Sequence, residues 1–391
     1  MKSARASLVF PVLIALLTHC AGDGSPTSPT DPSDPESSRP VDGRFVAERL
    51  VSLPNFPVAM AFTSANRILV SEKGGFGGVR TASVRVVEDG SLRDRRLITF
   101  HDVQTGGERG LLGIALDPNY QANSLVYAFY TSANRTNIVA RFTDDAFGQD
   151  GDEDAESVIT NLPSDVCGNH QGGSIAFGPD GMLYVSVGDN GCDRCTSQQA
   201  NTLAGKILRY TRDGSIPDDN PFADMPFPSS AFFATGLRNS FDFTFHPATG
   251  DIFATENGPS QNDEINRILP GVNYGWPFFQ CRESANTDCS VPRPSNRGPI
   301  QCYPSIIAPT GIAVYQGNVY PQPYQGNVFF GDFNNGVLHR LVLSEDGTTV
   351  VAADDRFLSG FGRIVDLAVS PDGILYVLTD QDIQRVMFVA N

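Results

Sequence analysis

A histidine in a glycine-rich loop is the first candidate for chemistry in this chain. His170 stands in the run NHQGG, just before an apolar segment that resembles a strand. An imidazole changes charge near neutral pH, so it suits a general base that takes a proton from a substrate. Asp189 follows in the polar run GDNG, which is typical of a turn. Taken alone, a loop histidine is more often a surface residue than a catalyst, so its surroundings decide the interpretation.

The cysteines are a second group of candidates. Apart from Cys20 there are six, at positions 167, 192, 195, 281, 289 and 302. The single CxxC has no second pair and no zinc-spaced histidine, and Thr196 after it excludes a CxxCH haem attachment. An even number in an exported chain favours disulfides over metal ligands. We expect pairing within the groups 167/192/195 and 281/289/302, with one odd member in each, which leaves a bridge between the groups open.

The composition limits the possible partners. The chain has 391 residues, with 44 Asp+Glu against 28 Lys+Arg and a formal net charge of −16. Only Lys2, Lys73 and Lys206 are lysines, and no basic block is present. Because binding to a phosphate backbone needs clustered cations, we expect no nucleic-acid partner. With 40% hydrophobic residues and many glycines and prolines, the chain is predicted to be globular and rich in turns.

The beginning of the chain has the pattern of an export signal. Residues 1–20 combine a basic start with an apolar run that is too short to span a bilayer. The run LTHC resembles a bacterial lipoprotein processing box, with Cys20 as the lipidated residue. Because His19 stands where a small residue is usual, ordinary cleavage without a lipid is the alternative. The protein is therefore expected to be exported, as a periplasmic or cell-envelope lipoprotein.

A flexible tether is predicted between the signal and the folded domain. Residues 21–40 are rich in Ser, Pro, Asp and Thr, a composition that does not build a packed core. We assign residues 41–391 to one folded domain. The membrane would then be reached only through the N-terminal lipid.

One short pattern recurs through the folded part of the chain. It consists of an apolar strand start, a turn and an alternating strand, at residues 61–70, 115–128, 177–185, 245–253, 324–330 and 369–377. Proline sets the turn, and Asp-Gly or Thr-Gly supplies the positive φ that reverses the chain, so each copy is predicted to be a β-hairpin. Helical periodicity is hard to find after residue 41.

Six hairpin units predict an all-β fold. We expect a six-bladed β-propeller of four-stranded antiparallel blades, because the copies recur along the whole chain with no linker between halves. A pair of β-sandwiches is the alternative. In a propeller the functional site lies at the mouth of the central channel, so we expect it among the loops that follow these hairpins.

Between Glu108 and Asp380 the chain resembles the glucose/sorbosone dehydrogenase family, and the aldose sugar dehydrogenases in particular. The similar stretches are residues 108–115, 170–174, 177–181, 188–189, 205–209, 236–239, 256–259, 263–266, 273–277 and 304–309. The family consists of six-bladed propellers that use pyrroloquinoline quinone (PQQ). The resemblance implies oxidation of an aldose at its anomeric hydroxyl, with a hydride passing to the quinone. Its partners would be a sugar substrate and an external electron acceptor, and we expect a monomer or a homodimer.

The resemblance also implies roles for the catalytic residues. His170 matches the general base, and Asp189 matches the carboxylate that orients it. Arg238 matches the arginine that lies over the cofactor and stabilises developing charge, and Asn239 matches a contact to the quinone. Glu108 stands where relatives place a Gln or Glu that contacts the substrate. An arginine beside a planar, carboxylated ring offers paired donors and a stacking plane.

Calcium is implied by the same resemblance. Gly258 and Pro259 match positions whose carbonyls hold the Ca²⁺ next to the cofactor, where it polarises the quinone carbonyl. Asp263, Glu264 and the carbonyl of Tyr274 resemble a second, structural Ca²⁺ site. Oxygen ligands suit Ca²⁺ rather than Zn²⁺. The alternative for the two acidic residues is a solvated loop.

Several cofactor positions depart from the family pattern. The remaining positions that the resemblance implies are Asn257, Tyr303, Ser305, Asn334 and Arg363. Asn334 stands where well-studied members have Lys, Val365 replaces the second Arg of an Arg-x-Arg, Tyr303 replaces Trp and Ser305 replaces Thr. Each lost cation costs about 1.5–3 kcal/mol of charge-assisted hydrogen bonding. The cofactor would then bind more weakly, bind differently or not bind, and the alternative function is a non-catalytic extracellular binding propeller.

Overall fold

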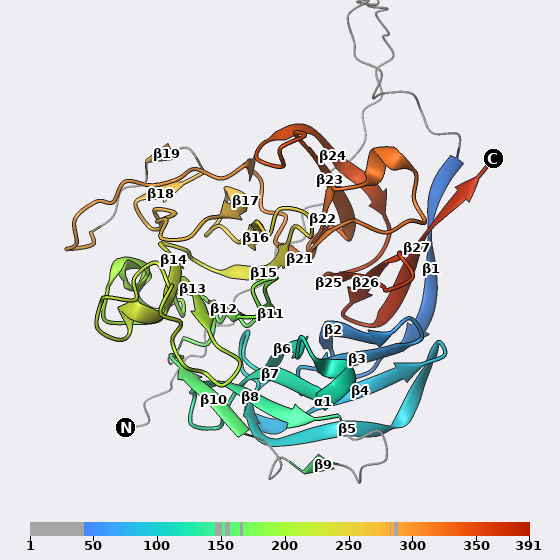
Figure 1. Ribbon diagram of the computed structural model, residues 1–391, viewed down its shortest axis with the longest axis horizontal. Coiled ribbons are helices and arrows are strands. Elements are labelled where there is room, and N and C mark those ends of the chain that lie inside the picture. The colour runs from blue at the N-terminus through green and yellow to red at the C-terminus, as the bar shows by residue number, and fades with distance from the viewer. Residues whose placement is uncertain (1–42, 145–150, 153–156, 165–166, 282, 285–287) are drawn as a thin grey trace, which may run out of the picture. The chain divides into compact units, whose positions relative to one another are not determined.

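The computed structural model describes residues 43–391, apart from residues 145–150, 153–156, 165–166, 282 and 285–287. In these residues six sheets stand side by side around a central axis, and each is one blade of a β-propeller (Figure 1). The prediction of an all-β, six-bladed propeller with four-stranded antiparallel blades is confirmed. The signal, Cys20 and the tether lie outside the described residues. None of the described helices is long and apolar enough to cross a membrane.

Within each blade the first strand lies innermost and the following strands lead outward. The first blade contains β2 (Pro57–Ser64), β3 (Arg67–Glu72), β4 (Val79–Glu88), β5 (Ser91–Gln104) and a parallel edge strand, β9 (Gly151–Asp152). The second contains β6 (Leu111–Leu116), β7 (Leu125–Thr131), β8 (Asn137–Thr143) and β10 (Ser157–Leu162). The third contains β11 (Ile175–Phe177), β12 (Leu183–Val187), β13 (Lys206–Tyr210) and β14 (Phe232–Thr235).

The second half of the ring repeats this order. The fourth blade contains β15 (Ser240–Phe245), β16 (Ile252–Glu256), β17 (Asp263–Ile268) and β20 (Gln301–Tyr303). The fifth contains β21 (Pro309–Val314), β22 (Val328–Asp332), β23 (Val337–Leu343) and β24 (Val350–Ser359). The sixth contains β25 (Ile364–Val369), β26 (Leu375–Thr379), β27 (Asp382–Ala390) and β1 (Gly43–Ser52).

Short elements connect the blades. The helix α1 (Tyr120–Asn123) lies in the hairpin between β6 and β7, and a small hairpin pairs β18 (Phe279–Gln280) with β19 (Glu283–Ser284). The described 3₁₀ turns are Arg194–Gln198, Ser229–Ala231 and Gln322–Tyr324.

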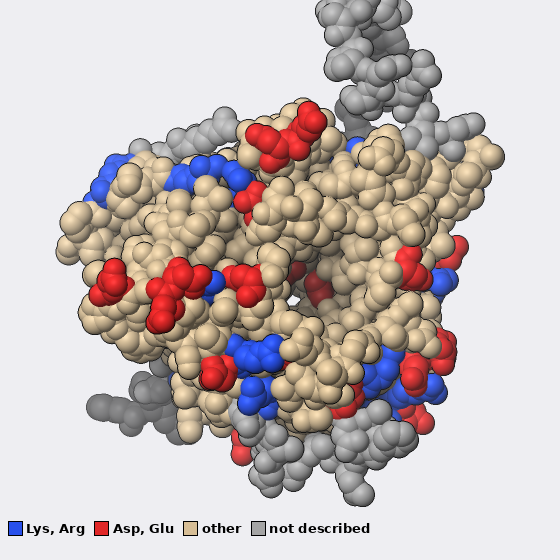
Figure 2. Space-filling view, viewed as in Figure 1, with Lys and Arg blue, Asp and Glu red and all other residues tan. Residues whose placement is uncertain are grey.

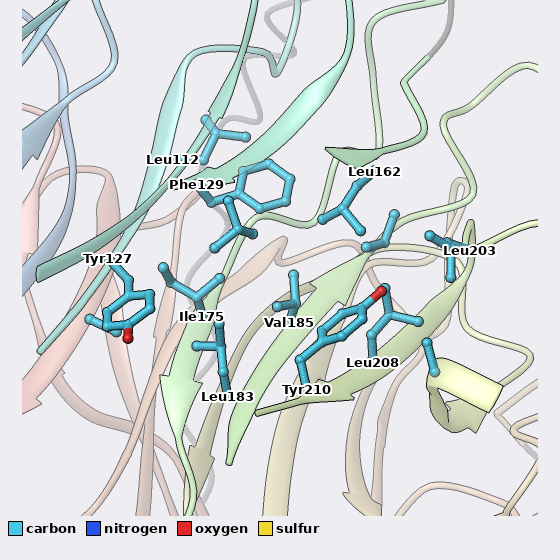
Figure 3. Packing of buried hydrophobic residues seen from close by; sticks show 14 of the residues in the cluster. Leu112, Tyr127, Phe129, Leu162, Ile175, Leu183, Val185, Leu203, Leu208 and Tyr210 are labelled. Carbon is cyan, nitrogen blue, oxygen red and sulfur yellow. The ribbon is translucent and has the colours of Figure 1, made fainter. Parts of the chain in front are cut away.

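Each predicted hairpin forms the inner pair of strands of one blade. In the third copy, Gly181 has φ +74° and the Asp180 carboxylate accepts from the Met182 N–H at 3.1 Å, which closes the turn before β12. The expected alternation is present, but both faces of β12 are buried because neighbouring blades cover them. Leu183 packs with residues of the second blade (Figure 3), and Tyr184 packs with residues of the fourth. The hairpins therefore build the core as well as the blades.

The ring is closed by the two ends of the described chain. The strand β1 pairs antiparallel with β27, from Gly43 opposite Ala390 to Ser52 opposite Asp382. The last blade therefore joins the first described strand to the last one (Figure 1). A propeller closed in this way leaves no unpaired gap between its first and last blades.

A channel runs between the inner strands. It has a volume of about 610 Å³ and is lined by β2, β6, β11, β15, β21 and β25, and Figure 2 shows its opening with acidic atoms inside it. The Asp242 carboxylate accepts from the Ser174 hydroxyl at 2.6 Å and from the Ile312 N–H at 3.0 Å. The Asp366 carboxylate accepts from the Met60 N–H at 2.7 Å. Both carboxylates therefore tie their inner strand to the strands of adjacent blades.

Two disulfides are present among the described cysteines. Cys167 pairs with Cys192 inside the first group, and Cys195 pairs with Cys289, which is the bridge between the groups that the sequence left open. The thiol of Cys281 is hydrogen-bonded to Cys302, and this contact and burial raise its pKa. Disulfides are typical of proteins in an oxidising extracellular or periplasmic compartment.

Candidate active site

The predicted catalytic residues meet at one end of the channel. Glu108 lies before β6, His170 before β11 and Arg238 before β15, whereas Asp189 follows β12. The inner strands all run in the same direction along the channel, so their beginnings meet at one face. The second strand of each hairpin ends at that same face. The propeller thus brings together residues as far as 131 positions apart, as in the 3.3 Å contact of Asn239 with Glu108.

His170 is held in a fixed orientation by both its backbone and its ring. Its φ of +53° lies in the left-handed region, which is costly for a residue with a Cβ. The backbone N–H donates to Glu108 Oε2 at 2.6 Å, and ring atom Nδ1 lies 2.6 Å from Asp189 Oδ1. A carboxylate at this distance places the proton on Nδ1, so Nε2 is left as the acceptor. This arrangement is suited to a general base that acts through Nε2.

Asp189 is buried and accepts hydrogen bonds on both oxygens. Oδ1 also accepts from the Gly191 N–H at 2.9 Å, and Oδ2 accepts from the indole N–H of Trp276 at 2.8 Å. These donors fix the carboxylate in the plane that His170 Nδ1 needs. Asp189 is thus bonded to both the imidazole of His170 and the indole of Trp276, a geometry that would orient the imidazole.

Arg238 lies directly against the histidine. Its Nη2 is 2.9 Å from His170 Nε2, and Nη1 donates to the Asn257 carbonyl at 2.7 Å. The guanidinium also lies over the Trp276 ring, 5.4 Å from its centroid. The arginine thus places positive charge beside the acceptor nitrogen, where negative charge on a reacting substrate would be stabilised.

A buried glutamate holds the Arg238-Asn239 pair in place. Glu256 Oε1 accepts from the backbone N–H groups of Arg238 at 2.8 Å and Asn239 at 2.5 Å, and Oε2 accepts from the Ser240 hydroxyl at 2.7 Å. The side chain of Asn239 accepts from the Gly172 N–H at 3.2 Å. Asn239 therefore links the loop of His170 to the start of β15.

Beside these polar residues lies a cavity of about 250 Å³. Its walls include the rings of Phe56, Phe76, Phe241 and Phe333, and its polar lining includes Lys73, Glu108 and Asn257. Flat aromatic walls with a few polar groups suit a planar, fused-ring ligand that carries polar edges. The residues present thus fit a quinone cofactor. The cavity adjoins His170, because Glu108 on its wall accepts a hydrogen bond from the His170 backbone N–H.

Besides Arg238 and Asn239, four predicted cofactor residues lie outside this lining. The Tyr303 hydroxyl donates to Asp355 at 3.0 Å, in the outer part of the fifth blade. Ser305 and Asn334 are exposed, and the Arg363 side chain is 62% exposed and pairs with Asp380 at 3.4 Å. The Arg363 guanidinium lies 5.5 Å from the centre of the Phe333 ring, so it is the one nearest to a cavity wall.

The predicted calcium residues surround a second, small cavity. Gly258, Pro259, Glu264 and Tyr274 line a space of about 20 Å³ together with Glu256. This is enough room for one ion or water, and carbonyl and carboxylate oxygens suit Ca²⁺. No group of three or more His, Cys, Asp or Glu side chains in the described residues could hold a metal. A calcium ion here would therefore need backbone carbonyls among its ligands.

Asp263 has a different environment from the other calcium positions. Its carboxylate accepts from the Gly258 N–H at 2.7 Å and from the Ile307 and Ala308 N–H groups at 2.8 Å each. These hydrogen bonds hold together two loops, and Ala308 lines the aromatic-walled cavity. Asp263 thus acts as an internal bracket and does not line the small cavity with Glu264.

Sequence reasoning missed three residues at the site: Lys73, Glu256 and Trp276. Trp276 is the only tryptophan of the chain and stands in a stretch that resembles the family, so its rarity was an available signal. Glu256 stands in another such stretch, but its role depends on accepting backbone N–H groups, which no spacing rule predicts. Lys73 lies in a separate blade, outside every matching stretch.

Comparison with known proteins identifies the family. A model of the Glucose / Sorbosone dehydrogenase family matches residues 54–388. The chain belongs to the glucose/sorbosone dehydrogenase family. The resemblance found in the motifs is therefore confirmed, and the site just described lies within the matched residues.

Members of this family with stated activities are similar to the chain along most of its length. Aldose sugar dehydrogenase YliI of Escherichia coli K12 is 29% identical over 350 residues, which cover 85% of this chain and 90% of that protein. Quinoprotein glucose dehydrogenase B of Acinetobacter calcoaceticus is 26% identical and covers 85% and 84%. The PQQ-bound aldose sugar dehydrogenase of Streptomyces coelicolor is 29% identical with a TM-score of 0.71, over 89% of this chain and 100% of that one.

Proposed function

We propose that this protein is an exported, PQQ-dependent aldose sugar dehydrogenase that oxidises the anomeric hydroxyl of an aldose to a lactone. One observation carries the proposal: His170 is oriented by Asp189 through Nδ1 and has its acceptor atom Nε2 beside Arg238. This is the constellation of a general base next to a cation. A similar chain of the same family binds PQQ.

The residues of the chain would divide the chemistry as follows. His170 Nε2 takes the proton of the anomeric hydroxyl, after that hydroxyl replaces the Arg238 N–H as its partner. Asp189 keeps the imidazole in the required tautomer and stabilises the imidazolium that forms. Glu108, on the cavity wall, accepts from a sugar hydroxyl, and Arg238 stabilises the developing negative charge. When bound, the quinone accepts the hydride from the sugar, and Ca²⁺ polarises the accepting carbonyl.

The cofactor would be held by residues of several blades. Asn257 lines the cavity, Arg238 and Asn239 are hydrogen-bonded to Asn257, and the rim positions are Tyr303, Ser305, Asn334 and Arg363. The carbonyls of Gly258 and Pro259 would hold the calcium ion beside the quinone. The resemblance assigns Asp263, Glu264 and the Tyr274 carbonyl to a second, structural calcium ion, but Glu264 and Tyr274 line the same one-ion cavity as Gly258 and Pro259. Of these, Asp263 is already bound to three N–H groups, so Glu264 is the better candidate.

The location follows from the N-terminal pattern and the disulfides. We infer that the mature chain begins at Cys20 and carries a lipid there. Mass spectrometry of the mature N-terminus tests this directly. A first residue other than Cys20, or an unmodified Cys20, would contradict the lipid anchor and leave simple export.

The exposed rim favours a second candidate function, a non-catalytic extracellular binding propeller. Asn334 carries no charge where relatives have a lysine, and Arg363 is turned toward Asp380. A propeller with so few anchors for a tricarboxylated quinone would bind it weakly. The polar network of His170 would then have a structural role.

Reduction of an artificial electron acceptor separates the two functions. The purified protein is incubated with PQQ and Ca²⁺, and dye reduction is followed as different aldoses are added. Aldose-dependent reduction that requires the quinone supports the dehydrogenase. Its absence at saturating quinone, in a folded protein, would exclude the dehydrogenase and favour the binding propeller.

A further inference from the structure

Lys73 is a buried cation that the mechanism above does not use. It directly follows β3 and is 4% exposed. Its Nζ donates to the Thr105 carbonyl at 2.8 Å and to the Gly75 carbonyl at 3.3 Å, and lies 4.6 Å from the centre of the Phe76 ring. Its partners are thus neutral groups, although burial of an ammonium ion is costly without an opposite charge.

The neighbouring blade fixes the lysine in this position. A Cβ on Gly110 would lie 2.5 Å from Lys73 Cγ and 2.7 Å from its carbonyl oxygen, so only glycine leaves room for the lysine stem. The Leu111 N–H donates to the Lys73 carbonyl at 3.4 Å. The stem is therefore held between the first and second blades, and the ammonium group has little freedom to turn away.

Glu108 is the carboxylate whose charge acts on Lys73, but it is bound elsewhere. It accepts from the backbone N–H of His170 and from the side chain of Asn239. Burial lowers the pKa of Lys73 to about 8, and the charge of Glu108 opposes that change. An anion that enters the cavity would complete the coordination of the ammonium group and raise its pKa again.

The lining of the aromatic-walled cavity indicates what that anion is. Lys73 is the one Lys or Arg among the described residues that line it, and Val365, at a position where relatives carry an arginine, also lines it. The cavity suits a flat ring system, and Lys73 lies beside the ring of Phe76 at its wall. A planar ligand with a carboxylate at its edge fits both features.

We propose that Lys73 binds a carboxylate of the quinone and thereby replaces, from the first blade, a cation missing at Asn334 and Val365. This inference rests on the proposed function, because it takes the quinone as the ligand. The contact is a charge-assisted hydrogen bond in a partly desolvated site, where such bonds are strong. A carboxylate on a sugar acid is the other source of the same chemistry, so the test is made without sugar.

The test compares quinone affinity in variants that keep or remove the charge. The apoprotein is titrated with PQQ in the presence of Ca²⁺ and without sugar, and binding is followed by absorbance. Lys73→Gln keeps a donor for the Thr105 carbonyl but loses the charge, and we expect its dissociation constant to rise about 10- to 100-fold. Lys73→Arg keeps the charge and should bind nearly as wild type. Arg80→Gln, an exposed residue beyond the same loop, controls for net charge.

A second measurement uses the unmodified chain. Lys73 and Lys206 are the lysines of a mature chain that begins at Cys20, and acetylation of each is followed by mass spectrometry with PQQ, with a sugar acid alone and with neither. Bound quinone should slow acetylation of Lys73 about tenfold or more. The paired carboxylate stabilises the ammonium form of the lysine, and only the free amine reacts with the reagent. Lys206, whose Nζ donates to three carbonyls away from this cavity, should be unaffected. This measurement decides the question even where Lys73→Gln does not fold.

The outcomes separate this inference from the proposed function. If wild type binds PQQ and neither the Gln variant nor the acetylation rate differs as stated, Lys73 is not an anchor, and the dehydrogenase proposal stands. If wild type does not bind PQQ at all, the proposed function fails first and this inference fails with it. If only a sugar acid protects Lys73, the lysine recognises substrate and the inference is overturned.

Discussion

At the scale of single residues, the site depends on how His170 is held. Its left-handed backbone conformation persists because Glu108 and Asp189 each accept one of its N–H groups. These hydrogen bonds offset the backbone strain, and they fix the direction in which the acceptor nitrogen of the imidazole points. Such strained conformations cluster at functional sites, so His170 is the residue whose replacement tests the proposed function.

Replacement of His170 tests the assignment of the base. For His170→Gln we expect kcat for aldose oxidation to fall by about 10²–10⁴, the range for loss of a general base. Quinone affinity should change little, because the base acts on the sugar. Dye-reduction kinetics and a PQQ titration measure the two quantities. His101→Gln, at an exposed position on β5, is the control. Equal activity of the two variants would show that His170 is not the base.

Asn334 provides the reverse test, in which a missing cation is added. The Asn334 backbone N–H donates to the Ile307 carbonyl. The next residue, Ala308, lines the cavity, and the Asn334 side chain is exposed. We expect Asn334→Lys to strengthen PQQ binding by about 1.5–3 kcal/mol through a new charge-assisted hydrogen bond. Val351→Lys adds the same charge on the exposed outer strand β24 and should have no effect. An unchanged affinity in Asn334→Lys would mean that this rim does not reach the quinone carboxylates.

At the scale of secondary-structure elements, β1 connects the two ends of the ring. Its Phe45 packs against Tyr320, Tyr324, Phe357 and Phe388, with ring centroids 4.8–5.1 Å apart. Tyr320 and Tyr324 lie between β21 and β22 of the fifth blade, Phe357 lies on β24 of the same blade, and Phe388 lies on β27 of the sixth. The closure thus depends on aromatic packing as well as on the strand pairing of β1 with β27.

Truncation of Phe45 should weaken this closure. We expect Phe45→Ala to lower the free energy of unfolding by about 2–4 kcal/mol, because it removes a large side chain from an aromatic cluster. Urea unfolding followed by circular dichroism gives the value. The control is Val389→Ala, at an exposed position of the partner strand opposite Arg44. If both variants lose equally little free energy of unfolding, the closure is held by the backbone pairing of β1 with β27 alone.

At the scale of the whole molecule, two carboxylates in the channel join adjacent blades. Burial raises the pKa of Asp242 to about 6, and burial together with the charge of Asp242 raises the pKa of Asp366 well above its usual value. The folded protein therefore binds these protons more tightly than the unfolded chain does. The resulting stabilisation is complete below about pH 4 and is lost as the pH rises through about 6.

This linkage predicts a pH dependence of stability that one substitution reduces. The free energy of unfolding of wild type should decline between about pH 4 and about pH 7, and Asp242→Asn should reduce that decline by on the order of 2 kcal/mol. Asp94→Asn, exposed on β5, should keep the full decline. Urea unfolding at both pH values measures it. An equal decline in Asp242→Asn and wild type would show that the channel pair does not titrate in this range.

The amino-acid sequence by itself determined the blade count and the polar core of the site. Each hairpin is a local structure, closed by residues such as Pro179 and Gly181 whose backbone preferences act over a few positions. The six copies therefore predicted the six blades. His170, Asp189 and Arg238 stand in motifs long enough to resemble a family, and the structure brings these three together. The rim positions Ser305 and Asn334 were assigned from the same resemblance, yet they lie exposed, outside the cavity lining.

Only the tertiary structure decided the contacts between distant segments. The bond from Trp276 to Asp189 spans 87 positions, and the Cys195–Cys289 bridge spans 94. Lys73 reaches the cavity from the first blade because Gly110, which directly precedes β6 of the second blade, leaves space for its side chain. Such contacts depend on how the blades are placed around the channel, which is set by packing between sheets. No local pattern carries that information, because a turn or strand forms in the same way whichever neighbour it later meets.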